Sequence, residues 1–369
     1  MKNMQHMKRL LLTSIALSLI IGLSAQKPHF DRYRFTEAST LTITGKLIPT
    51  ENPYNRVDTN RFKGFTKSEN LQVRCPAGLA VAFRTNSPSI AVYTRYGYAF
   101  TDLPSTNGIA YRGYDLYIKK EGKWLFAASG VLSMYHLNDT LRLIKGMDTS
   151  MKECLLYLPL YSEAYSIQLG VEDGSEIRPV ENPFRHRIGI FGSSFTHGVS
   201  TSRSGMCYPS QLSRMTGLEF LNLGCSGNCR MQDYFADVLC AADVEALVFD
   251  AFSNPTIAQI EERLFPFIEK IQAAHPGIPL IFQRTIRREG RNFRIDEEAE
   301  EQQRIDVADS LMAIAVKKYK DVYYIYPNAS SPLHEASVDG THPDNHGYTL
   351  WAESIEKPLL KILKKYGIR

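Results

Sequence analysis

The stretch FGSSFTHG, residues 191–198, places two adjacent serines directly after an apolar run. A turn of small residues after a buried strand is where an α/β protein exposes reactive groups. A serine hydroxyl is too weakly acidic to attack a carbonyl unless a neighbouring base takes its proton. The alternative is that both serines only cap the helix that follows. The chemistry of this stretch therefore depends on whether a base, an acid and oxyanion donors occur elsewhere in the chain.

A base and an acid occur together in VDGTHPDNHG, residues 338–347. In this interpretation Ser194 is the nucleophile and His342 takes its proton. Asp339, three residues before the histidine, orients the ring and stabilises its charged form. The spacing lets one short loop place both side chains on the same side. The alternative is a helix-start loop with an incidental histidine, but the aspartate and the serine at a strand end favour catalysis.

Two further positions are candidates for the oxyanion hole. Gly227 lies in NLGCSGNC, residues 222–229, and Asn254 lies in FSNP. A glycine lets its N–H approach a substrate closely, and an asparagine amide supplies another donor. The backbone N–H of Ser194 would be the third donor. Each position also has a structural interpretation, since Gly227 suits any turn and Asn254 suits the cap of the next helix.

The second half of the chain predicts the elements that would position these groups. Five apolar runs recur about 25 to 40 residues apart, as expected for buried parallel strands; they are RIGIFG, EFLNLG, ALVFDAF, PLIFQRT and VYYIYPN. Amphipathic stretches separate them, and one more closes the chain. This alternation predicts a three-layer α/β/α fold with a parallel sheet. Ligands of such sheets bind at the carboxyl ends of the strands, where the candidate residues lie.

The first half has a different pattern. From about residue 30 to 180 it contains short runs rich in β-branched and aromatic residues, separated by Gly, Pro, Asn and Asp. No long stretch with helical periodicity interrupts them. This pattern predicts an all-β jelly-roll or sandwich domain. We therefore expect three segments: a signal peptide at 1–25, a β-sandwich accessory domain at 26–182 and a hydrolase domain at 183–369.

The signal peptide is predicted from a basic start followed by an apolar run that ends in small residues at Ala25. An uncleaved membrane anchor is the alternative, but the run is short for a membrane span. We expect a bacterial exported protein, periplasmic or secreted, with no stable span after cleavage. The six cysteines could then form disulfides or remain buried thiols. The net charge is +4, and acidic and basic residues are well mixed along the sequence. We therefore expect no nucleic-acid partner.

At these residues the sequence resembles the SGNH (GDSL-type) hydrolases. GSSFTHG is similar to their first block, SGN at 226–228 to their second, FSN ending at Asn254 to their third, and DGTHP to their last. The resemblance implies Ser194 as nucleophile and the Asp339–His342 pair as its partners. It also implies Gly227 and Asn254 as oxyanion donors.

One departure from this family concerns the residue before the nucleophile. Ser193 stands where these enzymes usually have aspartate, although a subgroup reading Gly-Thr-Ser is closer. That subgroup carries an N-terminal β domain with a G-x-D-L-Y motif, which GYDLY at 113–117 matches. We expect Asp115 of this motif to have a structural role. The resemblance therefore covers nearly the whole chain after the signal peptide.

The candidate residues predict a serine esterase, and the resemblance implies small acyl esters as its substrates. An exported enzyme with a β-sandwich domain favours acetyl esters of carbohydrate first among them. No metal or organic cofactor is expected. A lipase or lysophospholipase, an acyltransferase and a non-catalytic glycan-binding protein remain alternatives. Arg203, in the loop after the nucleophile, is a candidate substrate contact or a surface charge. The oligomeric state does not follow from the sequence.

Overall fold

The structure is a computed structural model that describes residues 30–99, 103–131 and 138–369. The predicted signal peptide lies outside these residues. Arg34–Arg369 forms one compact unit. None of the helices in the described ranges is both long enough and apolar enough to cross a membrane.

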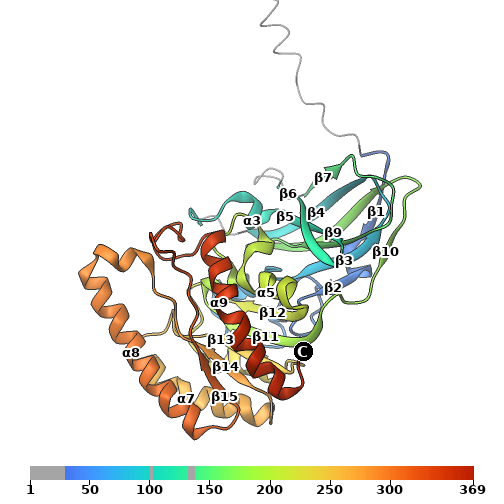
Figure 1. Cartoon of the computed structure of the whole chain (residues 1–369). Coiled ribbons are helices and arrows are strands. Elements are labelled where there is room, and N and C mark those ends of the chain that lie inside the picture. Colours follow the sequence, from blue (N-terminus) through green and yellow to red (C-terminus); the bar gives the residue numbers. More distant parts are fainter. Residues whose placement is uncertain (1–29, 100–102, 132–137) are drawn as a thin grey trace, which may run out of the picture. The chain divides into compact units, whose positions relative to one another are not determined.

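The first half folds into two antiparallel sheets, as the sequence predicts (Figure 1). One sheet has the order β1 (Tyr33–Glu37), β9 (Ser162–Glu172), β4 (Ser89–Ala99) and β7 (Asn138–Lys145). The other has the order β10 (Ile177–Pro179), β3 (Ala80–Thr85), β8 (Lys152–Tyr157), β5 (Tyr114–Lys120) and β6 (Lys123–Gly130), with β2 (Thr42–Thr44) paired to β3. Apolar residues from both sheets form one buried cluster, among them Phe83, Val92, Leu156 and Leu169. This half is therefore a β-sandwich.

The second half contains a five-stranded parallel sheet of order β12-β11-β13-β14-β15. Its strands are β11 (Arg185–Gly192), β12 (Leu218–Gly224), β13 (Ala246–Asp250), β14 (Leu280–Gln283) and β15 (Val322–Ile325). All five coincide with the predicted apolar runs. The helices are α4 (Ser194–His197), α5 (Tyr208–Thr216), α6 (Asp233–Cys240), α7 (Ile257–Ala274), α8 (Ile295–Lys318) and α9 (Asn345–Leu363).

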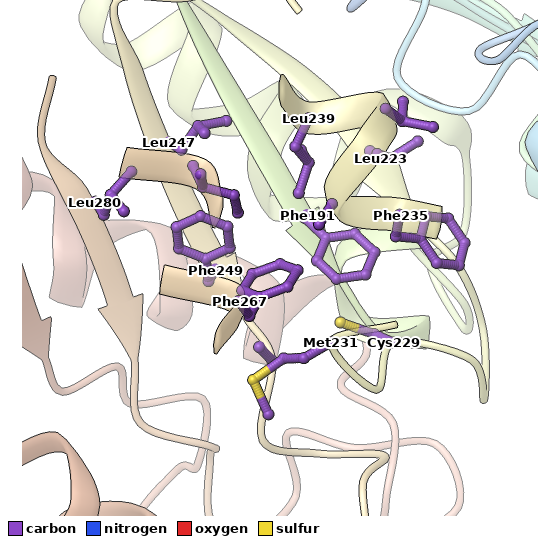
Figure 2. Packing of buried hydrophobic residues seen from close by; sticks show 14 of the residues in the cluster. Phe191, Leu223, Cys229, Met231, Phe235, Leu239, Leu247, Phe249, Phe267 and Leu280 are labelled. Carbon is purple, nitrogen blue, oxygen red and sulfur yellow. The ribbon is translucent and has the colours of Figure 1, made fainter. Parts of the chain in front are cut away.

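Side chains that alternate along the strands build a core on each face of this sheet. Phe191 and Phe249 lie in the cluster with α6, α7 and α8, whereas Ile190 and Val248 lie in the cluster with α5 and α9. Figure 2 shows the first cluster. The ring centroid of Phe267 lies 6.0 Å from that of Phe191 and 5.6 Å from that of Phe249. This alternation follows from the two-residue period of a strand. The predicted three-layer arrangement is confirmed.

One of these cores also contains residues from the first half of the chain. Leu47, Ile48, Val57 and Val73 are buried in the same cluster as Phe191. The two halves therefore share apolar contacts, and a domain boundary at residues 182 and 183 stays a prediction.

The structure differs from the sequence expectation in two short helices within the β half. These are α2 (Lys67–Val73) and α3 (Gly108–Arg112). A capping box begins α2, with the Thr66 side chain accepting from the Glu69 N–H and the Glu69 side chain accepting from the Thr66 N–H. The T-x-x-E spacing in TKSE is the sequence signal for this helix. All six cysteines are free thiols, and five of them are buried.

Candidate active site

The two serines at the end of β11 have different surroundings. Ser193 is the N-cap of α4, because its hydroxyl oxygen accepts a hydrogen bond from the Phe195 N–H at 3.2 Å. The hydroxyl of Ser194 instead lies 3.1 Å from His342 Nε2. Only one of the two serines therefore acts as a cap. The other is available for chemistry.

His342 joins Ser194 to Asp339 in a continuous chain of hydrogen bonds. Its Nδ1 lies 2.8 Å from Asp339 Oδ2. A carboxylate only accepts hydrogen bonds, so Nδ1 carries the proton and Nε2 is the acceptor that faces the serine hydroxyl. The other oxygen of Asp339 accepts the backbone N–H groups of Thr341 and His342 at 3.0 and 2.8 Å. The loop therefore fixes both the ring orientation and the tautomer.

These contacts also keep Asp339 ionised. Burial works against the charged form, but the hydrogen bonds from the His342 ring and backbone outweigh it and hold the pKa of Asp339 below its ordinary value. A carboxylate beside Nδ1 stabilises the imidazolium that forms when the ring takes a proton. The pair is therefore suited to general-base catalysis.

A second histidine near the serine in sequence is unsuited to this role. His197, in α4, is fully buried, and its Nε2 lies 2.7 Å from the carbonyl oxygen of Leu160. Burial, followed by the charge of Arg56, lowers its pKa well below the ordinary value. His342 is therefore the histidine that can exchange protons with Ser194.

The two predicted oxyanion donors lie in the same cavity as Ser194 and His342. This cavity has a volume of about 740 Å³. The side-chain oxygen of Asn254 accepts the Cys229 N–H at 3.2 Å, which leaves its amide nitrogen as a donor on the other side. Gly227 has a φ of 71°, a conformation that favours glycine.

Residues from both halves of the chain line this cavity. Leu103, Pro104 and Ser105 precede α3 in the β half. The remaining lining residues belong to the second half: Ser194, Phe195, Val199, Ser226, Gly227, Asn254, Arg288, Val338, Asp339, Thr341 and His342. Another cavity, of about 750 Å³, is lined by residues of α2, α6 and α7 and contains none of the predicted site residues. The chemistry therefore places the candidate site in the first cavity.

A buried carboxylate that we did not predict from the sequence lies beside Ser193. Asp250, at the end of β13, accepts hydrogen bonds on Oδ2 from the Ser193 hydroxyl at 2.7 Å and the Ser193 N–H at 3.0 Å. Thr196 and Ser253 also donate to it. Burial raises its pKa, although these hydrogen bonds act in the opposite direction. The signal in the sequence is an aspartate that ends the apolar run ALVFDAF.

Arg203 is not among the residues that line the cavity. Its guanidinium donates to both oxygens of the buried Asp115 at 3.0 Å and to the Tyr117 hydroxyl at 2.7 Å. Asp115 also accepts the Gly205 N–H at 2.9 Å. These contacts tie the loop after Ser194 to β5, and a contact between Arg203 and a substrate stays a prediction. The structural role expected for Asp115 agrees with these contacts, although a side chain of that loop supplies two of its hydrogen bonds.

Two family models match the chain. The model of the GDSL-like lipase/acylhydrolase family matches residues 185–360. A model of the N-terminus of SGNH-hydrolase-type esterases, named after the GxDLY motif, matches residues 33–177. A search of curated proteins gave no match.

Several solved structures are similar to the chain. A GDSL-like lipase from Bacteroides ovatus is 35% identical, with a TM-score of 0.86, covering 90% of this chain and 98% of that one. A salicylyl-acyltransferase from a tetracycline biosynthetic pathway is 18% identical, with a TM-score of 0.65, covering 92% and 100%. A family two carbohydrate esterase from Cellvibrio japonicus is 11% identical, with a TM-score of 0.59, covering 90% and 98%.

The latter two similarities establish a shared fold. Two further findings establish the family of the chain. They are its 35% identity to the Bacteroides ovatus protein over nearly the whole of both chains and the two family matches. The chain belongs to the GDSL-like lipase/acylhydrolase (SGNH) family of carboxylic ester hydrolases and carries that family's GxDLY-type N-terminal region.

Proposed function

We propose that this protein is an exported serine esterase that removes small acyl groups, acetyl first among them, from carbohydrate. The observation that supports this most directly is the chain of hydrogen bonds from Ser194 through His342 to Asp339. It lies in a cavity that also contains Gly227 and Asn254.

The reaction proceeds through an acyl-enzyme. Ser194 Oγ attacks the ester carbonyl carbon while His342 Nε2 takes its proton. The oxyanion of the tetrahedral intermediate accepts hydrogen bonds from the N–H groups of Ser194 and Gly227 and from the Asn254 amide. His342 then protonates the leaving alcohol. Water attacks the acyl-serine carbonyl while His342 Nε2 takes its proton, and His342 returns that proton to Ser194 Oγ as the C–O bond to the serine breaks and the carboxylic acid leaves.

Two features support carbohydrate as the substrate. The chain shares its fold with a family two carbohydrate esterase. Its β half contributes residues 103–105 to the cavity, which supports a contact between this half and a bulky alcohol beyond the ester. A long acyl chain as in lipases remains the alternative within hydrolases.

A series of 4-nitrophenyl esters from acetate to palmitate tests the proposal on the wild type and Ser194→Ala. We expect acetate to be the fastest substrate and the alanine variant to lose activity by at least about a thousandfold. Ser213→Ala is a matched control, because Ser213 is buried in α5 outside the cavity. Equal, slow rates for wild type and Ser194→Ala on every ester would reject the catalytic role and favour a glycan-binding protein. Preference for palmitate would favour the lipase alternative.

Acyl transfer is the second candidate, because the chain shares its fold over 92% of its length with a salicylyl-acyltransferase. The same serine, histidine and oxyanion donors would serve, with an acceptor hydroxyl in place of water. Product analysis with and without a sugar acceptor separates the two. Transfer to the sugar in excess of acetate release would identify a transferase.

Export is part of the proposal and rests on the first 25 residues. Expression of the full-length gene in a bacterium, followed by N-terminal sequencing of the purified protein, tests it. We expect a mature chain that begins at Gln26 in the periplasm or medium. A full-length chain retained with the membrane would contradict cleavage.

A further inference from the structure

The loop that carries Gly227 is held by a side chain from the other half of the molecule. Gln72 lies in α2, in the β half, and its side chain is buried. Its Oε1 accepts the Ser226 N–H at 2.6 Å, and its Nε2 donates to the Ser226 carbonyl at 2.9 Å. One amide therefore satisfies both backbone groups of the residue that precedes the proposed oxyanion donor.

The hold on the Ser226 carbonyl determines the direction of the Gly227 N–H. The two groups belong to one peptide unit, and in a planar trans peptide the C=O and N–H point in opposite directions. Asn228 Nδ2 donates to the same carbonyl at 2.7 Å, so two donors fix its position. The N–H of Gly227 therefore points away from Gln72. Gly227 lines the cavity of Ser194, whereas Gln72 does not.

Neighbouring groups of the β half support the same loop. Tyr161 Oη lies 2.7 Å from the Ser226 hydroxyl. The buried Arg56 donates to the Gly224 carbonyl at 2.7 Å and to the Gln72 carbonyl at 2.8 Å. The guanidinium thus ties α2 to the end of β12, where the loop begins. Without the hold on Ser226, this peptide could rotate, since a glycine at the next position resists rotation least.

We propose that Gln72 is a positioning residue that aims the Gly227 N–H at the oxyanion, so that the β half completes the oxyanion hole of the hydrolase half. The inference rests on the proposed esterase function. Gln72 touches no reacting atom; it acts only through the Ser226–Gly227 peptide. Its loss should weaken binding of the transition state more than binding of the ester, because only the tetrahedral state carries a full negative charge on oxygen.

The test compares Gln72→Met and Gln72→Glu with the wild type on 4-nitrophenyl acetate. Methionine preserves volume but makes neither hydrogen bond, and glutamate lacks the amide donor to the Ser226 carbonyl. We expect kcat to fall about 10-fold to 100-fold with little change in KM, a smaller loss than deletion of an oxyanion donor, about 100-fold to 1,000-fold. The inhibition constant of butylboronic acid, which forms a tetrahedral anion on the serine, should rise by a similar factor.

Gln211→Met and Gln211→Glu are matched controls. Gln211 is also a buried glutamine whose amide makes two hydrogen bonds outside its own helix, to the Met206 carbonyl at 2.7 Å and from the Thr349 hydroxyl at 2.9 Å. The Gln72 amide makes its two to Ser226 and a further one to Ser68 Oγ within α2, at 3.2 Å. A purely structural role would make the two pairs of variants alike: lower thermal stability, with kcat and boronate inhibition unchanged in the folded fraction.

A second variant guards against misfolding of the Gln72 variants. Asn228→Ala removes the other donor to the Ser226 carbonyl from a half-buried loop position. It should lower kcat and weaken boronate inhibition in the same way. Suppose that the wild type is active and that boronate inhibition is unchanged in Asn228→Ala and in the folded Gln72 variants. This result would overturn the role of Gln72 but leave the proposed esterase function standing. A wild type that neither hydrolyses esters nor reacts with a fluorophosphonate at Ser194 would overturn the proposed function and this inference with it.

Discussion

At the scale of single residues, Ser193 carries a hydroxyl at the position where the resemblance to the GDSL-type hydrolases predicts a carboxylate. The structure supplies a carboxylate from β13 instead, because Asp250 binds both the hydroxyl and the N–H of Ser193. The hydroxyl also caps α4. The turn is therefore held by a hydrogen-bond network that spans two strands.

Restoring the usual residue should damage this network. Ser193→Asp would place a second buried carboxylate beside Asp250, and two like charges at that distance cannot both ionise without cost. We expect a loss of about 2–4 kcal/mol in the free energy of unfolding and a large loss of esterase activity. Adding Asp250→Ser to this variant should recover most of the lost stability and most of the lost esterase activity. Urea unfolding measures the stability of each variant, and hydrolysis of 4-nitrophenyl acetate measures its activity. If Ser193→Asp alone is as stable as the wild type, the expectation is wrong.

Asp250 should also leave a signature in the pH dependence of stability. Its pKa in the folded protein is raised above the ordinary value of 3.8, so the folded state binds more protons than the unfolded state in the window between the two values. The stability that this group contributes is therefore present at low pH and is lost as the pH rises through its folded pKa.

Asp250→Asn removes this titration while its side-chain oxygen keeps the contacts to Ser193 and Thr196. Relative to the variant, the wild type should lose stability as the pH rises above 3.8 and through the raised pKa of folded Asp250. Urea unfolding across this range gives the difference. Asp243→Asn, at a fully exposed side chain, is the control and should parallel the wild type. Parallel curves for all three proteins would exclude the effect.

At the scale of elements, the site is assembled from loops at the carboxyl ends of strands. Ser194 follows β11, Gly227 follows β12, Asn254 follows β13, and the Asp339–His342 loop comes between β15 and α9. Because neighbouring parallel strands run in the same direction, their carboxyl ends lie together at one edge of the sheet. The loop after the nucleophile is further tied to β5 by the Asp115–Arg203 ion pair.

This ion pair should contribute to stability more than to catalysis. Arg203→Met leaves the carboxylate of Asp115 buried with the Gly205 N–H as a remaining donor. We expect a loss of about 3–5 kcal/mol in the free energy of unfolding. Turnover of 4-nitrophenyl acetate by the folded fraction should change little. The double variant Arg203→Met, Asp115→Leu should regain stability, and a raised KM without loss of stability would instead indicate a substrate contact.

At the scale of the whole molecule, the two halves of the chain share a buried core. Leu47, Ile48, Val57 and Val73 are buried in a core built on the parallel sheet. Each such side chain contributes about 1.5–3 kcal/mol when it is removed from water. Residues 103–105 line the cavity, and Gln72 holds the loop of Gly227.

A chain that starts at Pro183 should therefore not yield an active enzyme. Its parallel sheet would expose the apolar surface that the β half covers, and the Gly227 loop would lose its support. Soluble yield, circular dichroism and ester hydrolysis measure the outcome against the chain that starts at Gln26. Full activity of the shorter chain would show that the β half serves neither stability nor the site.

The sequence by itself determined the two fold classes, because strand and helix periodicities are local properties that survive without tertiary context. It also singled out Ser194, Asp339 and His342, because together these residue types at predicted strand ends can supply a nucleophile, an orienting acid and a base. It left α2 unpredicted although TKSE carries a capping-box signal, because a helix of seven residues leaves little periodicity to detect.

Only the tertiary structure decided which long-range contacts hold the site together. Ser193 and Asp250 are 57 residues apart, Asp115 and Arg203 are 88 apart, and Gln72 and Ser226 are 154 apart. No period or motif in the chain relates such pairs, because packing of the two halves brings them together. The physical reason is that a sequence pattern encodes which face of an element is apolar, whereas the partner of a buried polar group depends on which elements become neighbours.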